Sequence, residues 1–450
     1  MQKIITKKLK NDKIQHKKKG GEMEEIRKGK GDYEWFIKAR FGLFIHWGLY
    51  ALPARHEWVK HREEIPNEVY DEKYFKIFNP DLYNPKEWDF IAEKAGMKYA
   101  VITTKHHEGF CLWDSKLTDY KATNTPAKRD LLREFVEAFR EEGFKIGFYY
   151  SLIDWHHPHF TIDRIHPLRN HPEKEKLNKE RDMSKYREYL HGQIKELLTE
   201  YGKIDILWAD FSYPGPDGKG KDDWDSEKLV KMIRNLQPHI LLNNRLDLED
   251  EWDFITPEQV VPYEWPTING KKVIWESCQT FSGSWGYHRD EATWREPEEI
   301  IKTLIDCVSK GGNLLLNVGP TARGEFDYRV KERLEKIGEW MFYHSPSIYN
   351  CTEAPKEFKA PPDCRLTYNP EKNSLYVHIF SWPYKFLVLE GSAYKERVKY
   401  AQLLNDGSEI KIGMDEWYKK QVGEKEGIAL ILPPFKPKVV VPVIELLLKC

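Results

Sequence analysis

Long apolar runs are absent from this chain of 450 residues. No stretch approaches the ~20 consecutive apolar residues that a membrane-spanning helix needs, so the sequence indicates no membrane partner. The basic beginning of the sequence also lacks the apolar core of a secretory signal peptide. We therefore expect a globular protein of the cytoplasm.

Cysteine is scarce, with six residues in the whole chain. The six lie far apart, without a C-x-x-C pair and without the regular spacing of a disulfide framework. Such a pattern is typical of reduced thiols in a reducing compartment. They are Cys111, Cys278, Cys307, Cys351, Cys364 and Cys450.

An excess of charge of either sign is also missing, because 71 Lys and Arg stand against 72 Asp and Glu. Nucleic acids and anionic membranes attract basic surfaces, so neither partner is indicated. The imbalance is local: residues 1–30 hold 11 basic and 4 acidic residues, and the remainder therefore has a net charge of about −8. This lysine-rich segment contains no aromatic residue and is predicted to be a disordered basic tail.

Phosphate-binding glycine motifs, G-x-G-x-x-G and G-x-x-x-x-G-K-[ST], do not occur, which disfavours a doubly wound nucleotide-binding fold. Residues 31–345 instead alternate short β-branched or aromatic runs with amphipathic segments of helical length. Over ~300 residues this alternation predicts an α/β fold, a (β/α)8-like catalytic barrel. The predicted strands are "RFGLFIHWG", "KYAVITT", "KIGFYYS", "IDILWAD", "HILLNN", "KVIWES" and "NLLLNVG".

After Ser345 the helical segments disappear, and the sequence predicts strands alone, from "CRLTYN" to "VVVPVIELLL", separated by turns. Short strands at such spacing are typical of a small antiparallel β-sandwich. We therefore predict three parts: a tail at residues 1–30, a barrel at 31–345 and a C-terminal β-sandwich at 346–450.

Chemically distinctive side chains follow the predicted barrel strands. In a parallel barrel these positions meet at one face, where active sites lie. Imidazoles, indoles, one guanidinium and several carboxylates suit a neutral polyhydroxylated ligand, because aromatic faces stack on C–H surfaces while polar groups bond hydroxyls. The residues are His46, His106, His107, Tyr149, Trp208, Asp210, Arg245, Glu258 and Glu276.

Six segments carry a more specific signal: "FGLFIHWGLYALPARHEW", "TTKHHEGFCLWDSKLTDY", "GFYYS", "LWAD", "SWGYHRDE" and "SKGGNLLLNVGP". Together, and in this order, they resemble the signature segments of the glycoside hydrolase family 29 α-L-fucosidases, over roughly residues 33–345. The resemblance implies a retaining exo-glycosidase that releases terminal α-L-fucose from fucosylated glycans or glycosides through a covalent fucosyl-aspartate. It also implies a barrel followed by a β-sandwich, without a metal or organic cofactor.

The resemblance also assigns individual residues. By motif match the nucleophile is the aspartate of "LWAD", Asp210. The substrate-binding residues implied by the same match are His46, Glu57, Trp58, His106, His107, Tyr149, Trp208, Arg245 and Trp285.

Retaining hydrolysis needs two carboxyl groups about 5–5.5 Å apart, one ionised to attack the sugar and one protonated to release the leaving group. Asp210 is expected to stay ionised beside Arg245, because a nearby cation lowers the pKa of a carboxyl group. Three carboxylates compete for the acid/base role: Glu258, Glu276 and Glu57. We favour Glu258, because its segment "WDFITPEQVV" resembles the one that carries the acid/base in several family members.

The other two candidates have alternative interpretations. Glu57 follows Arg55 and His56, and we expect it to accept a sugar hydroxyl while cationic neighbours keep it ionised. Glu276 is flanked by apolar strand residues in "IWESC" and fits a structural hydrogen-bonding role as well as that of a proton donor.

Two other functions stay open. His46, His106 and His107 fit a metal-dependent hydrolase, since imidazoles at barrel strand ends bind zinc. Against this, "FIHWG" offers one His where a metal-binding first strand more often offers two. A fucose-binding protein without turnover would keep the aromatic residues but lose a carboxylate, and both predicted carboxylates are present. The histidines of "DWHHPH" are predicted to line the rim of the cup rather than to bind a metal.

Overall fold

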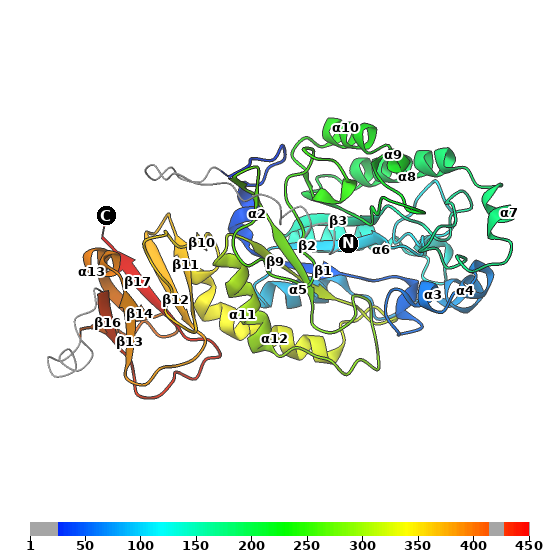
Figure 1. Cartoon of the computed structure of the whole chain (residues 1–450). Helices are drawn as coiled ribbons and strands as arrows, with labels where there is room; N and C mark the ends of the chain where they lie inside the picture. The colour runs from blue at the N-terminus through cyan, green and yellow to red at the C-terminus, as the bar shows by residue number, and fades with distance from the viewer. Residues whose placement is uncertain (1–25, 414–426, 450) are drawn as a thin grey trace.

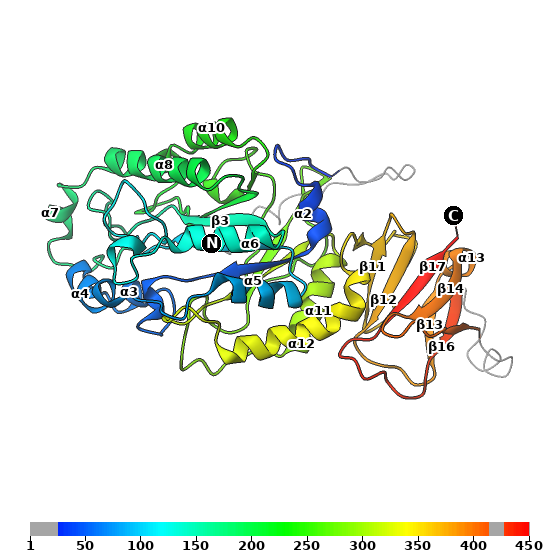
Figure 2. The ribbon, with the colours of Figure 1, turned by 180° about the vertical axis from the view of Figure 1, so that it is seen from behind.

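The computed structural model describes residues 26–413 and 427–449. They form a larger α/β body and a smaller, mostly β body that lie side by side, with helices α11 (Pro297–Val308) and α12 (Tyr328–His344) on the side of the larger body that faces the smaller one (Figures 1 and 2). Most of the predicted tail, residues 1–25, lies outside the described residues.

A parallel sheet of seven strands forms the centre of the larger body, in the order β5-β4-β3-β2-β1-β9-β8. Nearly every residue in these strands is buried, which is typical of a sheet covered on both faces and explains their continuous apolar runs. Each lies within or overlaps a strand predicted from the sequence. Their bounds are β1 (Phe41–Ile45), β2 (Tyr99–Lys105), β3 (Lys145–Ser151), β4 (Ile206–Asp210), β5 (Leu241–Leu242), β8 (Glu276–Thr280) and β9 (Asn313–Val318).

An irregular segment, residues 254–258, closes the sheet between its two edge strands. Isolated parallel bridges join it to the end of β5 on one side, Asn243 to Phe254, and to β8 on the other, Glu258 to Cys278. The segment therefore takes the eighth position, and the predicted (β/α)8-like barrel is confirmed. The sequence did not predict a strand here, because the run is short and contains Pro257.

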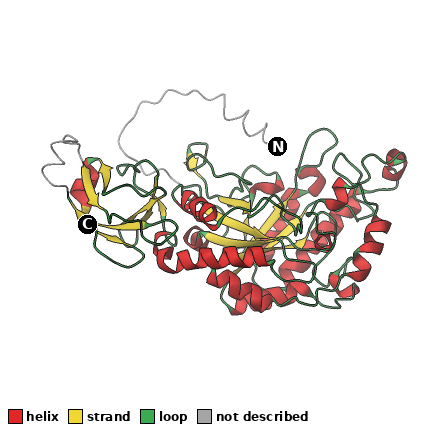
Figure 3. Ribbon diagram, turned by 90° about the horizontal axis from the view of Figure 1, so that it is seen from below, coloured by secondary structure: helices red, strands yellow, loops and turns green. Residues whose placement is uncertain are grey.

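Helices surround the barrel, as the red ring around the yellow strands in Figure 3 shows. Four of the long ones begin with a side-chain cap of the kind expected, from Asn84, Asp130, Asp182 and Asp327. The longer helices are α5 (Pro85–Lys94), α6 (Leu131–Glu141), α8 (Met183–Glu200), α10 (Ser226–Leu236), α11 and α12. The short ones are α2 (Glu34–Ala39), α3 (Val59–Arg62), α4 (Asn67–Lys73), α7 (Lys174–Asn178) and α9 (Lys221–Trp224).

The inside of the barrel has its own apolar core, separate from the core between sheet and helices. Phe36 of α2 enters it at the N-terminal end of the strands and contacts Tyr99 and Phe254, with ring centroids 5.4 and 5.0 Å apart. Phe44 and Trp208 meet above them at 5.2 Å. The barrel is therefore filled up to Trp208, and free space remains only toward the C-terminal ends of the strands.

The smaller body consists of two antiparallel sheets that share one hydrophobic cluster. The strands agree with those predicted after Ser345. One sheet contains β10 (Thr352–Glu353), β11 (Cys364–Asn369), β12 (Ser374–Ile379), β17 (Val443–Leu448) and β14 (Val398–Leu403). The other contains β13 (Phe386–Glu390), β16 (Gly427–Ile431) and β15 (Lys411–Ile412). Helix α13 (Ser392–Arg397) lies between β13 and β14 in the chain.

The last residues of the predicted tail contact the barrel. Ile26 forms a bridge with Lys272 in a hairpin of β6 (Thr267–Ile268) and β7 (Lys271–Lys272). Arg27 donates to the Trp252 carbonyl at 3.0 Å and lies over its ring. Residues 26–30 thus lie against the barrel, because Arg27 packs on the Trp252 ring, which is distant in the sequence and reaches Arg27 only in the folded chain.

Among the described residues, none of the helices has the length and apolar character that a membrane span needs.

Candidate active site

A cavity of about 170 Å³ opens at the C-terminal ends of the barrel strands. This volume is below the roughly 300–1,000 Å³ of pockets for drug-sized ligands, and it suits one monosaccharide ring. All predicted site residues line it except Glu57 and Glu276. The lining consists of Phe44, His46, Trp58, His106, His107, Tyr149, Trp208, Asp210, Phe211, Ser212, Tyr213, Arg245, Glu258, Cys278 and Trp285.

Asp210 is the last residue of β4, and its two carboxylate oxygens have different donors. The Tyr149 hydroxyl donates to Oδ2 at 2.8 Å, and Nη1 of Arg245 donates to Oδ1 at 2.7 Å. Burial raises the pKa of Asp210 above its ordinary value, while Arg245 and Tyr149 act in the opposite direction. The expected contact with Arg245 is present, but the expected net lowering of the pKa was wrong, because the loss of hydration outweighs one cation.

The residue after Asp210 has a strained backbone. Phe211 adopts a φ of 77°, in the left-handed region that side chains other than glycine avoid. Its ring contacts His107 and Trp58, with centroids 4.8 and 5.3 Å apart. The turn at Phe211 ends β4 abruptly and leaves the Asp210 carboxylate at the cavity surface.

Arg245 joins the two predicted catalytic carboxylates. It lies in the turn after β5, where Nε donates to Thr256 Oγ1 at 3.0 Å. Nη2 donates to Glu258 at 2.9 Å, while Nη1 holds Asp210. The side chain of Glu258 is 45% exposed and that of Asp210 is 13% exposed, so the two carboxylates differ in access to water. Water can therefore reach Glu258 more easily than Asp210.

The first-strand histidine, His46, is fixed in one tautomer by Asn317. Asn317 Nδ2 donates to the Trp285 carbonyl at 2.6 Å, which turns its Oδ1 toward His46 Nδ1 at 2.7 Å. Nδ1 of His46 therefore carries the proton, and Nε2 is left as an acceptor. Burial lowers the pKa of His46 to about 3, so the ring is neutral.

His107 is oriented in the same way by Ser151. The Ser151 hydroxyl donates to the Ile153 carbonyl at 2.7 Å, so its oxygen accepts from Nδ1 of His107 at 2.8 Å. Burial also holds the pKa values of His106 and His107 well below the ordinary value. The cavity thus presents neutral imidazoles, whose free nitrogens accept hydrogen bonds from hydroxyl groups.

Glu57 does not line the cavity, and its expected cationic neighbours are not its partners. Its Oε2 accepts from the backbone N–H groups of Trp285 and Gly286 at 3.1 and 2.9 Å. Arg55 instead pairs with Glu63 at the surface at 2.6 Å. Burial raises the pKa of Glu57. Glu57 therefore holds the loop that places the Trp285 indole at the cavity.

Glu276 lies at the opposite end of the barrel from the catalytic face. It is the first residue of β8, is fully buried, and pairs with Asn313 at the beginning of β9. Its carboxyl accepts from the Tyr99 hydroxyl and, at 3.3 Å, from Trp208 Nε1. Burial raises the pKa of Glu276 to about 7. Because it lies beneath Trp208, Glu276 has no path to a sugar in the cavity.

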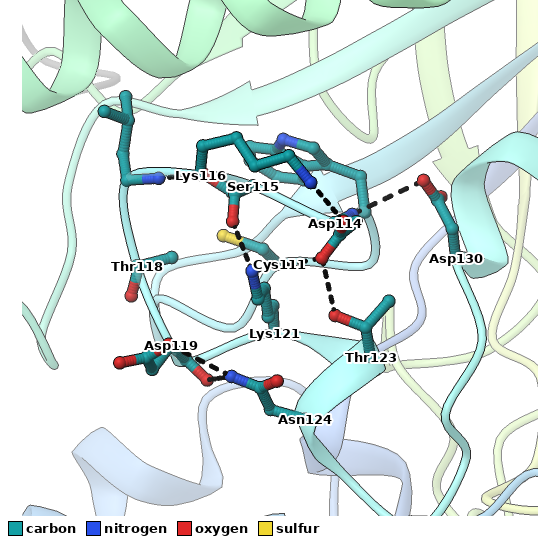
Figure 4. Close-up of polar contacts among 12 residues, drawn as sticks. Cys111, Asp114, Ser115, Lys116, Thr118, Asp119, Lys121, Thr123, Asn124 and Asp130 are labelled. Atoms are coloured by element: carbon teal, nitrogen blue, oxygen red, sulfur yellow. Dashed lines mark hydrogen bonds and ion pairs between the residues drawn. The ribbon is translucent and has the colours of Figure 1, made fainter.

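The loop after His106 and His107 is held by a polar network around Asp114 (Figure 4). Asp114 Oδ1 accepts from Lys121 Nζ at 3.0 Å and from Thr123 Oγ1 at 2.9 Å. Asp130 caps α6 and also accepts from the backbone N–H of Asp114. These contacts connect the loop to α6 and limit its movement beside the histidine pair.

The "DWHHPH" histidines do not line the cavity, contrary to the prediction. His156 stacks on Tyr120 with centroids 3.6 Å apart and contacts Asp71 at 2.9 Å. His157 packs on Tyr189 at 4.4 Å. His156 and His157 thus pack against Tyr120 and Tyr189, which are distant in the sequence, and not against the cavity. Across residues 26–413 and 427–449, no three His, Cys, Asp or Glu residues are grouped as metal ligands would be.

Several lining and supporting residues were missed by the sequence analysis. Phe44 and Cys278 lie two residues from His46 and Glu276, so the period of two in a strand could have placed them inside the barrel. Asn317 and Ser151 had no local signal, because their role depends on the histidines that they contact.

Comparisons with known proteins identify the family of this chain. A model of the alpha-L-fucosidase family matches residues 8–345. This chain belongs to the α-L-fucosidase family. Human plasma alpha-L-fucosidase is 30% identical over 387 residues, which cover 78% of this chain and 76% of the human protein.

Solved structures of the family also superpose on the chain. Alpha-L-fucosidase isoenzyme 1 from Paenibacillus thiaminolyticus is 46% identical, with a TM-score of 0.87 over 93% of this chain and 99% of its own. A family 29 α-L-fucosidase from Bacteroides thetaiotaomicron, solved as a trapped covalent intermediate with 2-fluoro-fucosyl fluoride, is 29% identical. Its TM-score is 0.80, and the match covers 95% of this chain and 99% of that one.

Proposed function

We propose that this chain hydrolyses terminal α-L-fucosides with retention of configuration, with Asp210 as nucleophile and Glu258 as acid/base. One observation carries the assignment: Arg245 contacts both carboxylates at the mouth of the cavity, at 2.7 and 2.9 Å. Carboxylates that share one guanidinium lie close together, as a retaining pair must. The family relationship supports the substrate and the double displacement.

In the first step the Asp210 carboxylate attacks C1 of the fucosyl ring and the bond from C1 to the leaving oxygen breaks. Glu258 transfers its proton to that oxygen, so the aglycone departs as a neutral alcohol. Tyr149 and Arg245 hold both oxygens of Asp210 and so aim the nucleophile. Arg245 also contacts Glu258, and this contact must open when Glu258 carries the proton that it donates.

In the second step water hydrolyses the fucosyl-aspartate. Glu258, now ionised, removes a proton from the water while the oxygen attacks C1, and the Asp210 carboxylate is released. The exposed side of Glu258 gives water access to the reaction from the solvent face. Neither step requires a metal ion or an organic cofactor.

Recognition of fucose follows from the lining. The free nitrogens of His46 and His107 accept hydrogen bonds from ring hydroxyls. Trp58, Trp208 and Trp285 provide apolar walls, which suit a sugar whose sixth carbon is a methyl group rather than a hydroxymethyl group. We also propose a cytoplasmic location, supported by the thiols of the five described cysteines, which are free and buried.

The decisive experiment is hydrolysis of p-nitrophenyl α-L-fucoside by the full chain, followed by NMR of the first-formed sugar. The α-anomer is expected first, at the same rate with and without a metal chelator. Formation of the β-anomer first, or complete loss of activity with the chelator, would contradict the proposal. The Asp210→Gly variant serves as the control for chemistry at this cavity.

A further inference from the structure

A buried carboxyl group without an assigned role lies directly beneath the cavity. Glu276 is 0% exposed, and its two oxygens contact neutral donors, the Tyr99 hydroxyl and the Trp208 indole N–H. A buried carboxyl of this kind costs stability, and an apolar side chain of similar size commonly packs as well or better. Its presence under the site therefore calls for a function other than core packing.

Trp208 connects this carboxyl to the nucleophile. Its indole lines the cavity floor, stacks on the Tyr149 ring with centroids 5.8 Å and planes 21° apart, and lies 4.6 Å below the Arg245 guanidinium. Tyr149 and Arg245 are the two side-chain donors that hold Asp210. A tilt of one indole would therefore displace both donors at once.

The indole is held both by packing and by one directional contact. It is buried inside the barrel, where it packs against the rings of Phe44 and Tyr149. The bond from Nε1 to Glu276 at 3.3 Å is directional and selects one orientation. Tyr99 holds the carboxyl from the other side, and Asn313 lies 3.4 Å from the Tyr99 hydroxyl, so the acceptor is itself fixed.

We propose that Glu276 is a positioning residue for Asp210, which it orients through the Trp208 indole. This inference rests on the proposed role of Asp210 as nucleophile. Glu276 neither touches the sugar nor transfers a proton to it. The essential feature of the side chain is an acceptor oxygen at this point.

Two substitutions separate positioning from packing and from proton transfer. Glu276→Gln keeps an acceptor oxygen for the Trp208 N–H, while its amide N–H2 faces the Tyr99 hydroxyl, which can accept instead of donate. This variant should retain kcat within roughly 3-fold. Glu276→Leu fills the space but leaves the indole N–H unpaired, and should lower kcat by roughly 10- to 100-fold, the cost of a misplaced reacting group. The loss should be equal for p-nitrophenyl fucoside and a fucosylated oligosaccharide, with little change in KM.

A double-mutant cycle with Trp208→Phe tests the route. Phenylalanine has no N–H to orient, so adding Glu276→Leu to Trp208→Phe should cost less than 2-fold in kcat, although Glu276→Leu alone costs much more. If the effects of the two substitutions on kcat were fully additive, Glu276 would act by another route and the proposal would be overturned. A decrease in kcat of more than 100-fold in Glu276→Gln would also overturn it. That second test does not depend on whether the Leu variant folds.

The controls distinguish this inference from the assignment of the nucleophile. Asp210→Gly measured alongside must be inactive; if it is active, the nucleophile is misassigned and the proposed function fails. If Asp210→Gly is inactive and Glu276→Leu equals the parent enzyme, only the positioning role fails. Dependence on the leaving group or rescue by azide in Glu276→Gln would instead identify Glu276 as the acid/base. Circular dichroism confirms folding of each variant.

Discussion

Arg245 donates from Nη1 to Oδ1 of Asp210 at 2.7 Å, across 35 residues of chain. The same guanidinium also contacts Glu258, so one cation is shared by two carboxylates. If Asp210 and Glu258 have the roles proposed above, Arg245 orients the nucleophile and must separate from the more exposed Glu258 before that residue donates a proton. The predictions below follow from this shared contact and from the groups around it.

Removal of Arg245 should shift the acidic limb of the pH profile of kcat/KM to higher pH. Asp210 attacks only when ionised, so kcat/KM falls as pH drops through its pKa, which burial already raises. Arg245 lowers that pKa, and Arg245→Met should therefore shift the limb to higher pH as well as reduce the rate. Profiles of kcat/KM with p-nitrophenyl fucoside test this. Arg55→Met, which loses a surface pair with Glu63 and a bond to the Pro53 carbonyl, should leave the limb in place.

Asp210→Gly should lower kcat by several orders of magnitude without unfolding the chain, because it removes the nucleophile from the end of a strand. Azide fits the vacated space and should attack the aryl fucoside directly, giving a fucosyl azide of inverted configuration. Turnover and product NMR provide the measurement. Near-parental activity in this variant would refute the role of Asp210.

Glu258→Ala should discriminate between leaving groups. A general acid matters most when the leaving oxygen is basic, so kcat/KM for a fucosylated oligosaccharide should fall by about 10²–10⁴-fold, and that for p-nitrophenyl fucoside far less. Azide should intercept the fucosyl-enzyme and give a fucosyl azide of retained configuration.

Glu57→Ala is the matched comparison for Glu258→Ala. Glu57 anchors the backbone of Trp285 and Gly286, so its loss should lower kcat/KM for both substrates by about the same factor. A leaving-group dependence in Glu57→Ala, and none in Glu258→Ala, would transfer the acid/base role to Glu57.

Asn317→Ala should weaken substrate binding more than chemistry. The amide fixes the His46 tautomer and holds the Trp285 carbonyl, and His46 and Trp285 both line the cavity. We expect KM to rise by roughly 10-fold, in line with one or two lost hydrogen bonds, with a smaller change in kcat. Asn235→Ala on the exposed face of α10 is the control and should leave both constants unchanged.

Glu276→Gln should change the pH dependence of stability. The pKa of Glu276 is about 7 in the folded chain against an ordinary 4.5, so the folded state binds this proton more tightly than the unfolded state. The contribution of Glu276 to wild-type stability must therefore fall as pH rises from 4.5 to 7, and glutamine removes this loss.

The variant and the parent should be equally stable below pH 4.5, whereas above pH 7 the variant should be more stable by up to about 3 kcal/mol. Denaturant unfolding of both proteins across this range gives the difference. A parent that equals or exceeds the variant above pH 7 would contradict the raised pKa.

Much of the fold could be predicted because its signals are local. Each strand of the barrel sheet was predicted from an apolar run, and several helices from segments of helical length between these runs. The segment 254–258 was not predicted, because Pro257 disfavours a strand in the local sequence. The segment takes its place in the sheet only because β5 and β8 are edge strands with free hydrogen-bonding groups on either side of it. The rim position of the "DWHHPH" histidines was wrong, since Tyr120 and Tyr189 reach them from distant parts of the chain.

The sequence by itself determined the barrel, the C-terminal strands and the residues that gather at the strand ends, because periodicity and motif order are properties of neighbouring residues. Only the tertiary structure decided the partners of each charge. Arg55 precedes Glu57 closely in the chain but pairs with Glu63, while Glu57 is held by backbone amides more than 200 residues away. Burial raises the pKa of Asp210 despite Arg245, because hydration and Coulomb energies depend on distances in space, and the order of residues does not contain those distances.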